Sequence, residues 1–162
     1  MNSRKPIVYI VDDDLSVRRA LSLLLKSHGF GVQTFMRAEE FLAFKHLKLP
    51  SCLVLDIQLP DMNGLLLQEV MERRGVSMPI VFITGHGDIP MSVKGMKAGA
   101  IDFITKPFTN KKLLDAIRQA ICKNKIQNKY NDEILIFFLC TFYFNSSCFK
   151  LNFLTFLILF SI

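Results

Sequence analysis

The sequence predicts a doubly wound α/β domain, in which helices cover both faces of a parallel β-sheet. The main observation is an alternation, repeated about five times, between a short apolar run and a longer amphipathic stretch. The connections between these stretches are short, which favours right-handed crossovers between parallel strands. The chain has 162 residues, enough for one such domain with a proper core and too few for two large ones.

The first two strand and helix units show the pattern clearly. Residues Ile7 to Val11 form an unbroken apolar run, which is typical of a strand buried on both faces. The stretch from Leu15 to His28 carries leucines on one stripe and is followed by Gly29, a common helix stop. The second unit is predicted as a strand over 31–35 and a helix over 38–47.

Three further units complete the predicted sheet. Their strands are expected over 52–56, 79–84 and 101–105, and their helices over 65–75, 91–99 and 110–121. The helix over 91–99 has Gly95 in its interior, at a cost of about 1 kcal/mol relative to alanine, and contains flexible methionines. We therefore expect this helix to be among the least stable elements.

Polar side chains follow the predicted strands where ligands bind in open α/β sheets, at the carboxyl ends. The residues at these positions are Asp12, Asp13, Asp14, Asp56, Thr84 and Lys106. Each alone has an ordinary structural explanation: an aspartate caps the next helix, a threonine ends a strand, and a lysine before proline is exposed. Their convergence on one edge of the sheet instead predicts a functional site.

Phosphoryl transfer to a carboxylate is the chemistry that needs this set of side chains. A carboxylate that attacks an anionic phosphate needs its surroundings to neutralise charge on the transferred oxygens. Asp12, Asp13 and Asp56 offer the oxygen ligands that Mg²⁺ prefers. Lys106 could pair with one phosphoryl oxygen and the Thr84 hydroxyl could bind another. Asp14 is expected to cap the first helix and not to bind the metal.

The motifs around these residues resemble the receiver domain of bacterial two-component response regulators, the CheY-like fold. They are "VDDD", "LVLDIQLPDMNG", "ITGHGD" and "GAIDFITKPF", and the similarity covers about Pro6 to Ile121. The last two motifs are most similar to the FixJ-type branch, whose members usually carry a helix-turn-helix output domain. The resemblance implies a flavodoxin-like sheet with strand order 2-1-3-4-5.

The resemblance also implies a role for each site residue. Asp56 becomes the phosphoacceptor, Asp12 and Asp13 the acidic pair, the Gln58 backbone carbonyl a further Mg²⁺ ligand, Thr84 and Phe103 the switch pair, Lys106 the phosphate-pairing lysine, and Pro107 a cis proline. The implied donor of the phosphoryl group is a sensor histidine kinase. Such a protein is a signalling phosphoacceptor, not an enzyme with a separate substrate, and its chemistry is limited to phosphorylation and dephosphorylation of its own aspartate.

Phosphorylation is expected to drive homodimerisation through the marginal helix over 91–99 and the strand over 101–105. The alternative function is an aspartate-dependent phosphatase or hydrolase of similar fold. That chemistry usually requires a second aspartate two residues after the first, where this chain has Gln58.

Composition excludes several other classes. The net charge of +6 comes from scattered lysines and arginines, so it does not predict a nucleic-acid interface. The four cysteines lack CxxC spacing, and neither a zinc site nor a disulfide framework is predicted. The first apolar run ends in aspartates and is too short for a signal peptide, so the expected compartment is the cytoplasm.

The composition changes abruptly after Ile121. From Cys122 onward the chain contains no glycine, alanine, arginine, valine, proline, methionine or histidine. We therefore expect a receiver domain over 1–122 and an irregular tail over 123–162, rich in Phe, Leu, Ile and Asn, which resembles translated AT-rich noncoding or out-of-frame DNA more than an evolved domain. No recognition helix is visible, so direct DNA binding is not expected.

A membrane-tethered receiver is the alternative reading of the tail. Its two apolar runs, 134–144 and 151–162, are each shorter than the roughly 20 residues that span a bilayer. Joining them would place Lys150 within the span, and insertion would be close to break-even. Membrane contact is therefore a secondary expectation, beside packing of the tail on the domain.

Overall fold

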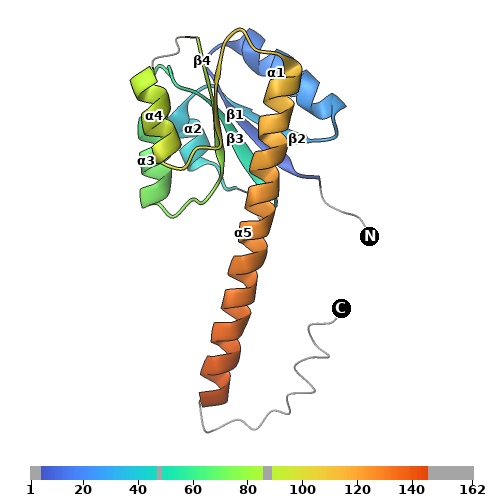
Figure 1. Ribbon diagram of the computed structural model, residues 1–162, viewed down its shortest axis with the longest axis vertical. Helices are drawn as coiled ribbons and strands as arrows, with labels where there is room; N and C mark the ends of the chain where they lie inside the picture. The colour runs from blue at the N-terminus through green and yellow to red at the C-terminus, as the bar shows by residue number, and fades with distance from the viewer. Residues whose placement is uncertain (1–4, 47–48, 86–88, 146–162) are drawn as a thin grey trace. The chain divides into compact units, whose positions relative to one another are not determined.

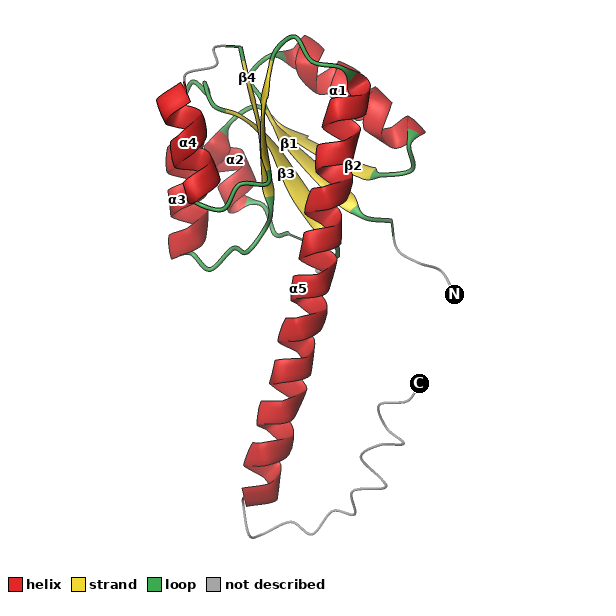
Figure 2. Cartoon of the chain, in the orientation of Figure 1, coloured by secondary structure: helices red, strands yellow, loops and turns green. Residues whose placement is uncertain are grey.

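The computed structural model describes residues 5–46, 49–85 and 89–145, and it contains a five-stranded parallel sheet (Figures 1 and 2). The strands are β1 (Ile7–Val11), β2 (Gly31–Phe35), β3 (Ser51–Asp56), β4 (Ile80–Thr84) and β5 (Asp102–Thr105). Their order is β2-β1-β3-β4-β5, and every neighbouring pair is parallel. The predicted fold class and strand order are confirmed.

Helices cover both faces of the sheet. They are α1 (Leu15–Ser27), α2 (Ala38–Ala43), α3 (Gly64–Arg73), α4 (Ile89–Lys97) and α5 (Asn110–Asn145). Leu21 and Leu25 of α1 pack with Leu113 and Ile117 of α5 in one core cluster. The opposite cluster takes side chains from α2 and α3. Alternate residues of each strand point into the two cores, as the strand period requires.

The second helix is shorter than predicted. It ends at Ala43, and Phe44 has extended backbone angles (φ −74°, ψ 136°). The Phe44 ring packs against the rings of Tyr9 and Phe35, with centroids 6.2 and 5.3 Å apart. This aromatic packing draws the chain out of the helix, although the local sequence would allow another turn.

Gly95 has a packing role that the sequence does not reveal. It is buried in α4, and a Cβ there would lie 3.1 Å from the Phe82 ring and 3.2 Å from Leu65 Cδ2. Glycine therefore permits a close approach of α4 to the sheet. Gln68 of α3 donates hydrogen bonds to the carbonyls of Gly95 (3.4 Å) and Ala98 (2.9 Å), and these contacts secure the C-terminal end of α4.

The last helix continues well past its predicted end at Ile121. Helix α5 reaches Asn145, so the expectation of an irregular tail from residue 123 is corrected for 123–145. The physical reason is that no glycine or proline follows Pro107 to end the helix. The part of the predicted tail over 146–162 lies outside the described residues.

The chain divides into two compact units, Met1–Ile126 and Gln127–Ile162. The first unit extends beyond the predicted boundary at residue 122 because Asn124 is buried within it. The Asn124 side-chain oxygen accepts a hydrogen bond from the Ser51 amide (2.9 Å), and its amide group donates to the Ser77 carbonyl (3.3 Å). Asn124 thereby joins α5 to the start of β3 and to the loop before β4.

In the second unit, the described side chains of α5 from Ile134 to Leu139 are all apolar and exposed. No helix within the described part of the chain combines the length and the apolar character needed to cross a membrane.

Replacement of Asn124 by alanine should destabilise the first unit by about 1–3 kcal/mol, because it leaves the buried Ser51 amide without its partner. Urea unfolding of the whole chain measures this change. Asn131→Ala is the matched control, since Asn131 is exposed on the same helix and the two substitutions change helix propensity equally. Equal stability of the two variants would contradict the structural role of Asn124.

Candidate functional site

The turn between β1 and α1 carries three consecutive aspartates. Asp12 is fully buried at the end of β1, and its Oδ1 accepts a hydrogen bond from the Asp14 amide (2.8 Å). Asp14 Oδ1 accepts from the amides of Ser16 (2.7 Å) and Val17 (3.4 Å), so Asp14 caps α1 as predicted. Asp13 is exposed, which leaves its carboxylate accessible.

Asp56 is the last residue of β3. Its side chain is almost completely buried, and its Oδ1 accepts a hydrogen bond from the Gln58 amide (2.9 Å). Gly64 begins α3 close against this strand end, since a Cβ at Gly64 would lie 2.6 Å from the Asp56 carbonyl oxygen. The Gly64 amide also donates to the Ile57 carbonyl (2.8 Å). Only glycine permits the loop to close this tightly.

Asp61 attaches the loop between β3 and α3 to the start of α2. Its two carboxylate oxygens accept hydrogen bonds from the backbone amides of Ala38 (3.3 Å) and Glu39 (3.0 Å), in the first turn of α2. Slight burial would raise the pKa of Asp61, but these backbone hydrogen bonds outweigh burial and lower it. Arg37, the N-cap residue of α2, provides no side-chain cap, so Asp61 caps the helix from another loop.

Lys106 contacts the carboxylates at the ends of β1 and β3. It follows β5, and its peptide bond to Pro107 is cis, as predicted. Its Nζ donates to Asp56 Oδ2 (2.7 Å) and to Asp12 Oδ2 (3.0 Å).

These contacts shift the pKa values of the groups involved. Partial burial would lower the pKa of Lys106, but its hydrogen bonds to Asp56 and Asp12 and their two negative charges raise it. Burial raises the pKa of Asp12, and its hydrogen bonds to Lys106 and the Asp14 amide offset this only in part.

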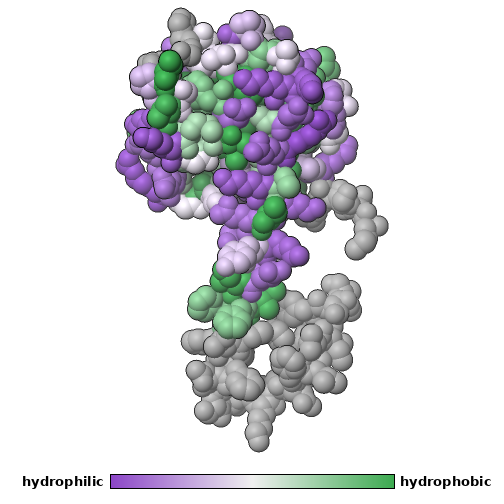
Figure 3. All heavy atoms as spheres, viewed as in Figure 1, coloured by the Kyte–Doolittle hydropathy of each residue, from purple (hydrophilic) through white to green (hydrophobic). Residues whose placement is uncertain are grey.

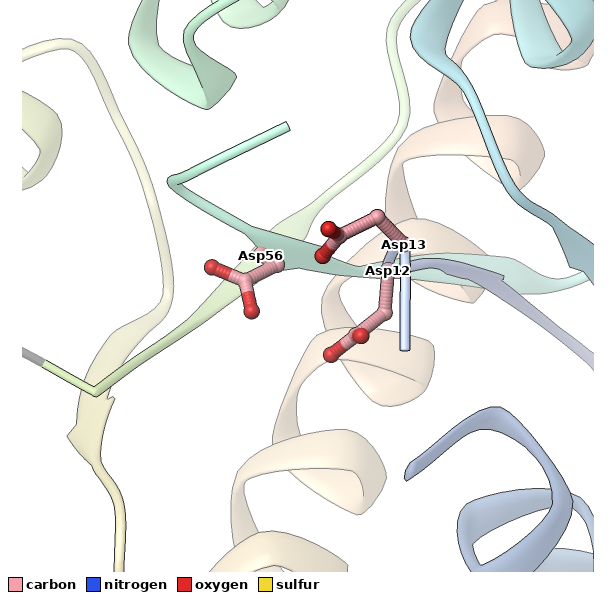
Figure 4. Close-up of side chains that lie close together, drawn as sticks. All are labelled: Asp12, Asp13 and Asp56. Carbon is pink, nitrogen blue, oxygen red and sulfur yellow. The ribbon is translucent and has the colours of Figure 1, made fainter. Parts of the chain in front are cut away.

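The three carboxylates suit a small divalent cation. Asp12, Asp13 and Asp56 each offer an oxygen, and these atoms lie within 4.8 Å of one another (Figure 4). The set contains only hard oxygen donors, which Mg²⁺ prefers over nitrogen or sulfur. The exposed carboxylate of Asp13 leaves one side of the cluster open to solvent. The residues therefore fit a magnesium ion that keeps part of its water shell.

Thr84 and Phe103 lie on the neighbouring strands. Thr84 is buried at the end of β4, and its carbonyl accepts a hydrogen bond from the Lys106 amide (2.7 Å). Phe103 lies on β5 opposite Phe82 of β4 and is partly buried, with the two ring centroids 5.9 Å apart. The sheet thus brings Thr84 to the acidic edge, and Phe103 lies within the outer strand beside it.

Asp61 and Arg18 also contribute to the site, although neither was predicted from the sequence. Arg18 Nη1 donates a hydrogen bond to the Asp12 carbonyl oxygen (2.6 Å). A local signal for Arg18 was present, because a cation near the N-terminus of a helix opposes the helix dipole. No local signal identified Asp61, whose partners lie more than twenty residues earlier in the chain.

Comparison with known proteins gives one consistent result. Residues 8–118 match the response regulator receiver domain family. The response regulator protein TodT of Pseudomonas putida is 48% identical over 121 residues, which cover 75% of this chain and 53% of TodT. The transcriptional regulatory protein FixJ of Rhizobium meliloti is 44% identical over 113 residues, which cover 70% of this chain and 55% of FixJ.

A low-resolution structure of the response regulator StyR superposes with a TM-score of 0.76. It is 48% identical in sequence, and the alignment covers 80% of this chain and 66% of StyR. The chain spans about half the length of the curated relatives it matches. The match therefore concerns the part of those proteins that corresponds to the first compact unit.

Proposed function

The chain belongs to the response regulator receiver domain family, and from this premise we propose that it is the phosphoacceptor of a two-component phosphorelay. In this proposal Asp56 receives the phosphoryl group from a phosphohistidine of a sensor histidine kinase. The observation that carries it is the position of Lys106, whose ammonium contacts both Asp56 and Asp12 beside the oxygen cluster. The alternative of an independent phosphatase has no comparable support, because Gln58 stands where its second aspartate would be.

The geometry around Asp56 suits attack by its carboxylate. The Gln58 amide donates a hydrogen bond to Asp56 Oδ1, and the Lys106 ammonium donates one to Asp56 Oδ2. As an Asp56 oxygen forms its bond to phosphorus, the phosphorus–nitrogen bond to the donor histidine breaks and its electron pair returns to the imidazole. Lys106 then pairs with a phosphoryl oxygen, and the Thr84 hydroxyl binds another.

The proposed cofactor is Mg²⁺, held by Asp12, Asp13, Asp56 and the Gln58 backbone carbonyl. When bound, the ion neutralises charge on the phosphoryl oxygens and orients the transferred group. Asp12 and Asp13 would otherwise repel an incoming phosphate, so the same carboxylates make the reaction dependent on a cation.

We assign Thr84 and Phe103 to the conformational response. A phosphoryl group on Asp56 would draw the Thr84 hydroxyl toward it, and the space vacated would admit the Phe103 ring. Phe103 contacts Phe82, and the Phe82 ring lies against Gly95 of α4. A movement of Phe103 can therefore change how α4 packs on the sheet.

The surface of α4 supports pairing with a second copy of the chain. Ile89, Val93 and Met96 form an apolar stripe at helical spacing, and their side chains are 76%, 45% and 44% exposed. Apolar surface is visible over α4 in Figure 3. We assign the phosphorylation-dependent dimer contact to this α4 stripe together with β5.

The chain should take up one phosphoryl group from acetyl phosphate in the presence of Mg²⁺, and Asp56→Asn should take up none, because the amide lacks the nucleophilic oxygen charge. Intact-mass measurement detects the added phosphoryl group. Asp115→Asn is a suitable control, since Asp115 is an exposed carboxylate on α5. Labelling that survives in Asp56→Asn, or that is unaffected by a chelator of Mg²⁺, would contradict the proposed chemistry.

The double substitution Ile89→Ser and Val93→Ser should weaken phosphorylation-dependent dimerisation at least about tenfold, because it removes the apolar surface that the contact would bury. Sedimentation velocity of residues 1–126, with Mg²⁺ and beryllofluoride as the phosphoryl mimic, measures the dimer fraction. Leu23→Ser is the control, since Leu23 is 75% exposed on α1. The same dimer fraction in the wild type and the α4 variant would exclude this surface as the contact.

A further inference from the structure

Arg18 makes a specific contact behind the acidic cluster. Its Nη1 donates a hydrogen bond of 2.6 Å to the backbone carbonyl of Asp12, six residues earlier in the chain. The Arg18 side chain is partly buried, whereas the side chain of the adjacent Arg19 is exposed. Arg18 and Arg19 carry the same charge but differ in their surroundings. Arg18 holds the backbone at the end of β1, where Asp12 provides the first carboxylate.

Two opposite electrostatic effects act on Arg18. The positive end of the α1 dipole disfavours a cation near the helix start, whereas the preceding carboxylates, including the N-cap residue Asp14, favour one. Lys106 already provides positive charge to the cluster through its contacts with Asp12 and Asp56. The feature that distinguishes Arg18 from a general counter-charge is its hydrogen bond to the Asp12 carbonyl.

The group that Arg18 holds is the peptide unit between Asp12 and Asp13. The Asp12 carbonyl and the Asp13 amide belong to the same planar group, so fixing the carbonyl restricts how both residues are presented. Other hydrogen bonds also hold the turn: the Asp12 amide donates to the Phe35 carbonyl (3.3 Å), the Asp14 amide donates to Asp12 Oδ1 (2.8 Å), and Lys106 Nζ donates to Asp12 Oδ2 (3.0 Å). Arg18 supplies the hydrogen bond from α1 to the Asp12–Asp13 peptide itself.

We propose that Arg18 is a positioning residue for the cation site, and that it holds the Asp12–Asp13 peptide so that both carboxylates converge with Asp56. The inference rests on the proposed function, because it concerns the Mg²⁺ that the phosphoryl transfer requires. In this proposal, Arg18 contacts neither the ion nor the phosphoryl group.

Two opposing effects make the inference testable. Removal of a nearby positive charge, by itself, strengthens the binding of a cation to the carboxylates. Loss of a group that orients metal ligands weakens binding, by about tenfold or more in known sites. The direction of the change in Mg²⁺ affinity therefore separates a positioning role from a purely electrostatic one.

The experiment measures the Mg²⁺ dissociation constant of the whole chain by calorimetric titration with the metal alone. Arg18→Gln should raise this constant about tenfold. Arg19→Gln removes the same charge without the contact and should leave it within about twofold of the wild-type value. Arg18→Lys keeps the charge and one donor group, and it should fall between these two variants.

The phosphorylation rate gives a second readout. If Arg18 acts through the cation site, acetyl phosphate should label Arg18→Gln slowly at low Mg²⁺ and close to the wild-type rate at saturating Mg²⁺. Thermal unfolding of each variant checks the fold, and if Arg18→Gln is unfolded, the comparison of Arg18→Lys with Arg19→Lys takes its place.

Mg²⁺ affinity in Arg18→Gln equal to or higher than in Arg19→Gln would overturn the inference and leave the proposed function intact. Absence of Mg²⁺ binding in the wild type would overturn the cation site itself, and this inference with it.

Discussion

The structure depends on the compensation of three carboxylates that lie within one small volume. Asp12 and Asp56 are buried, and the oxygens of these two residues and of Asp13 lie within 4.8 Å of one another. Removal of such charges from water is expensive unless opposite charge and hydrogen bonds replace the solvent. The Lys106 ammonium provides this compensation through contacts of 2.7 and 3.0 Å. Because its partners come from β1 and β3, the cluster forms only when the sheet has its observed strand order.

The loops around this charge cluster are held by contacts with other elements. Arg18 of α1 holds the Asp12 carbonyl, Asp61 attaches the β3–α3 loop to α2, and Gly64 permits close approach to the Asp56 carbonyl. On the other side, Phe103, Phe82 and Gly95 connect β5 to α4 through ring and backbone packing. In the proposed switch, this second set of contacts would carry a change at Thr84 to the surface of α4, while the first set holds the acidic edge.

The site was largely predictable from the sequence because it follows from topology. Alternating strand and helix patterns define a parallel sheet, and the carboxyl ends of parallel strands meet at one edge, so Asp12, Asp56 and Lys106 had to converge. Asp61 and Asn124 act through contacts with backbone groups distant in the sequence, which no local pattern encodes. Arg18 contacts the Asp12 carbonyl only six residues away, and its local signal was a cation near a helix N-terminus. The extent of α5 was not predicted either, because a change of composition was interpreted as the end of the helix although no helix-breaking residue was present.

The most direct test of the account is a crystal structure of the chain grown with Mg²⁺ and beryllofluoride. One magnesium ion should be bound by oxygens of the acidic cluster and of the Gln58 carbonyl, with beryllofluoride bound to the Asp56 carboxylate. Lys106 Nζ should leave Asp56 Oδ2 and contact a fluorine atom. A structure in which beryllofluoride is bound at another residue, or in which Asp56 is unmodified and Lys106 still contacts it with no ion in the cluster, would contradict the account.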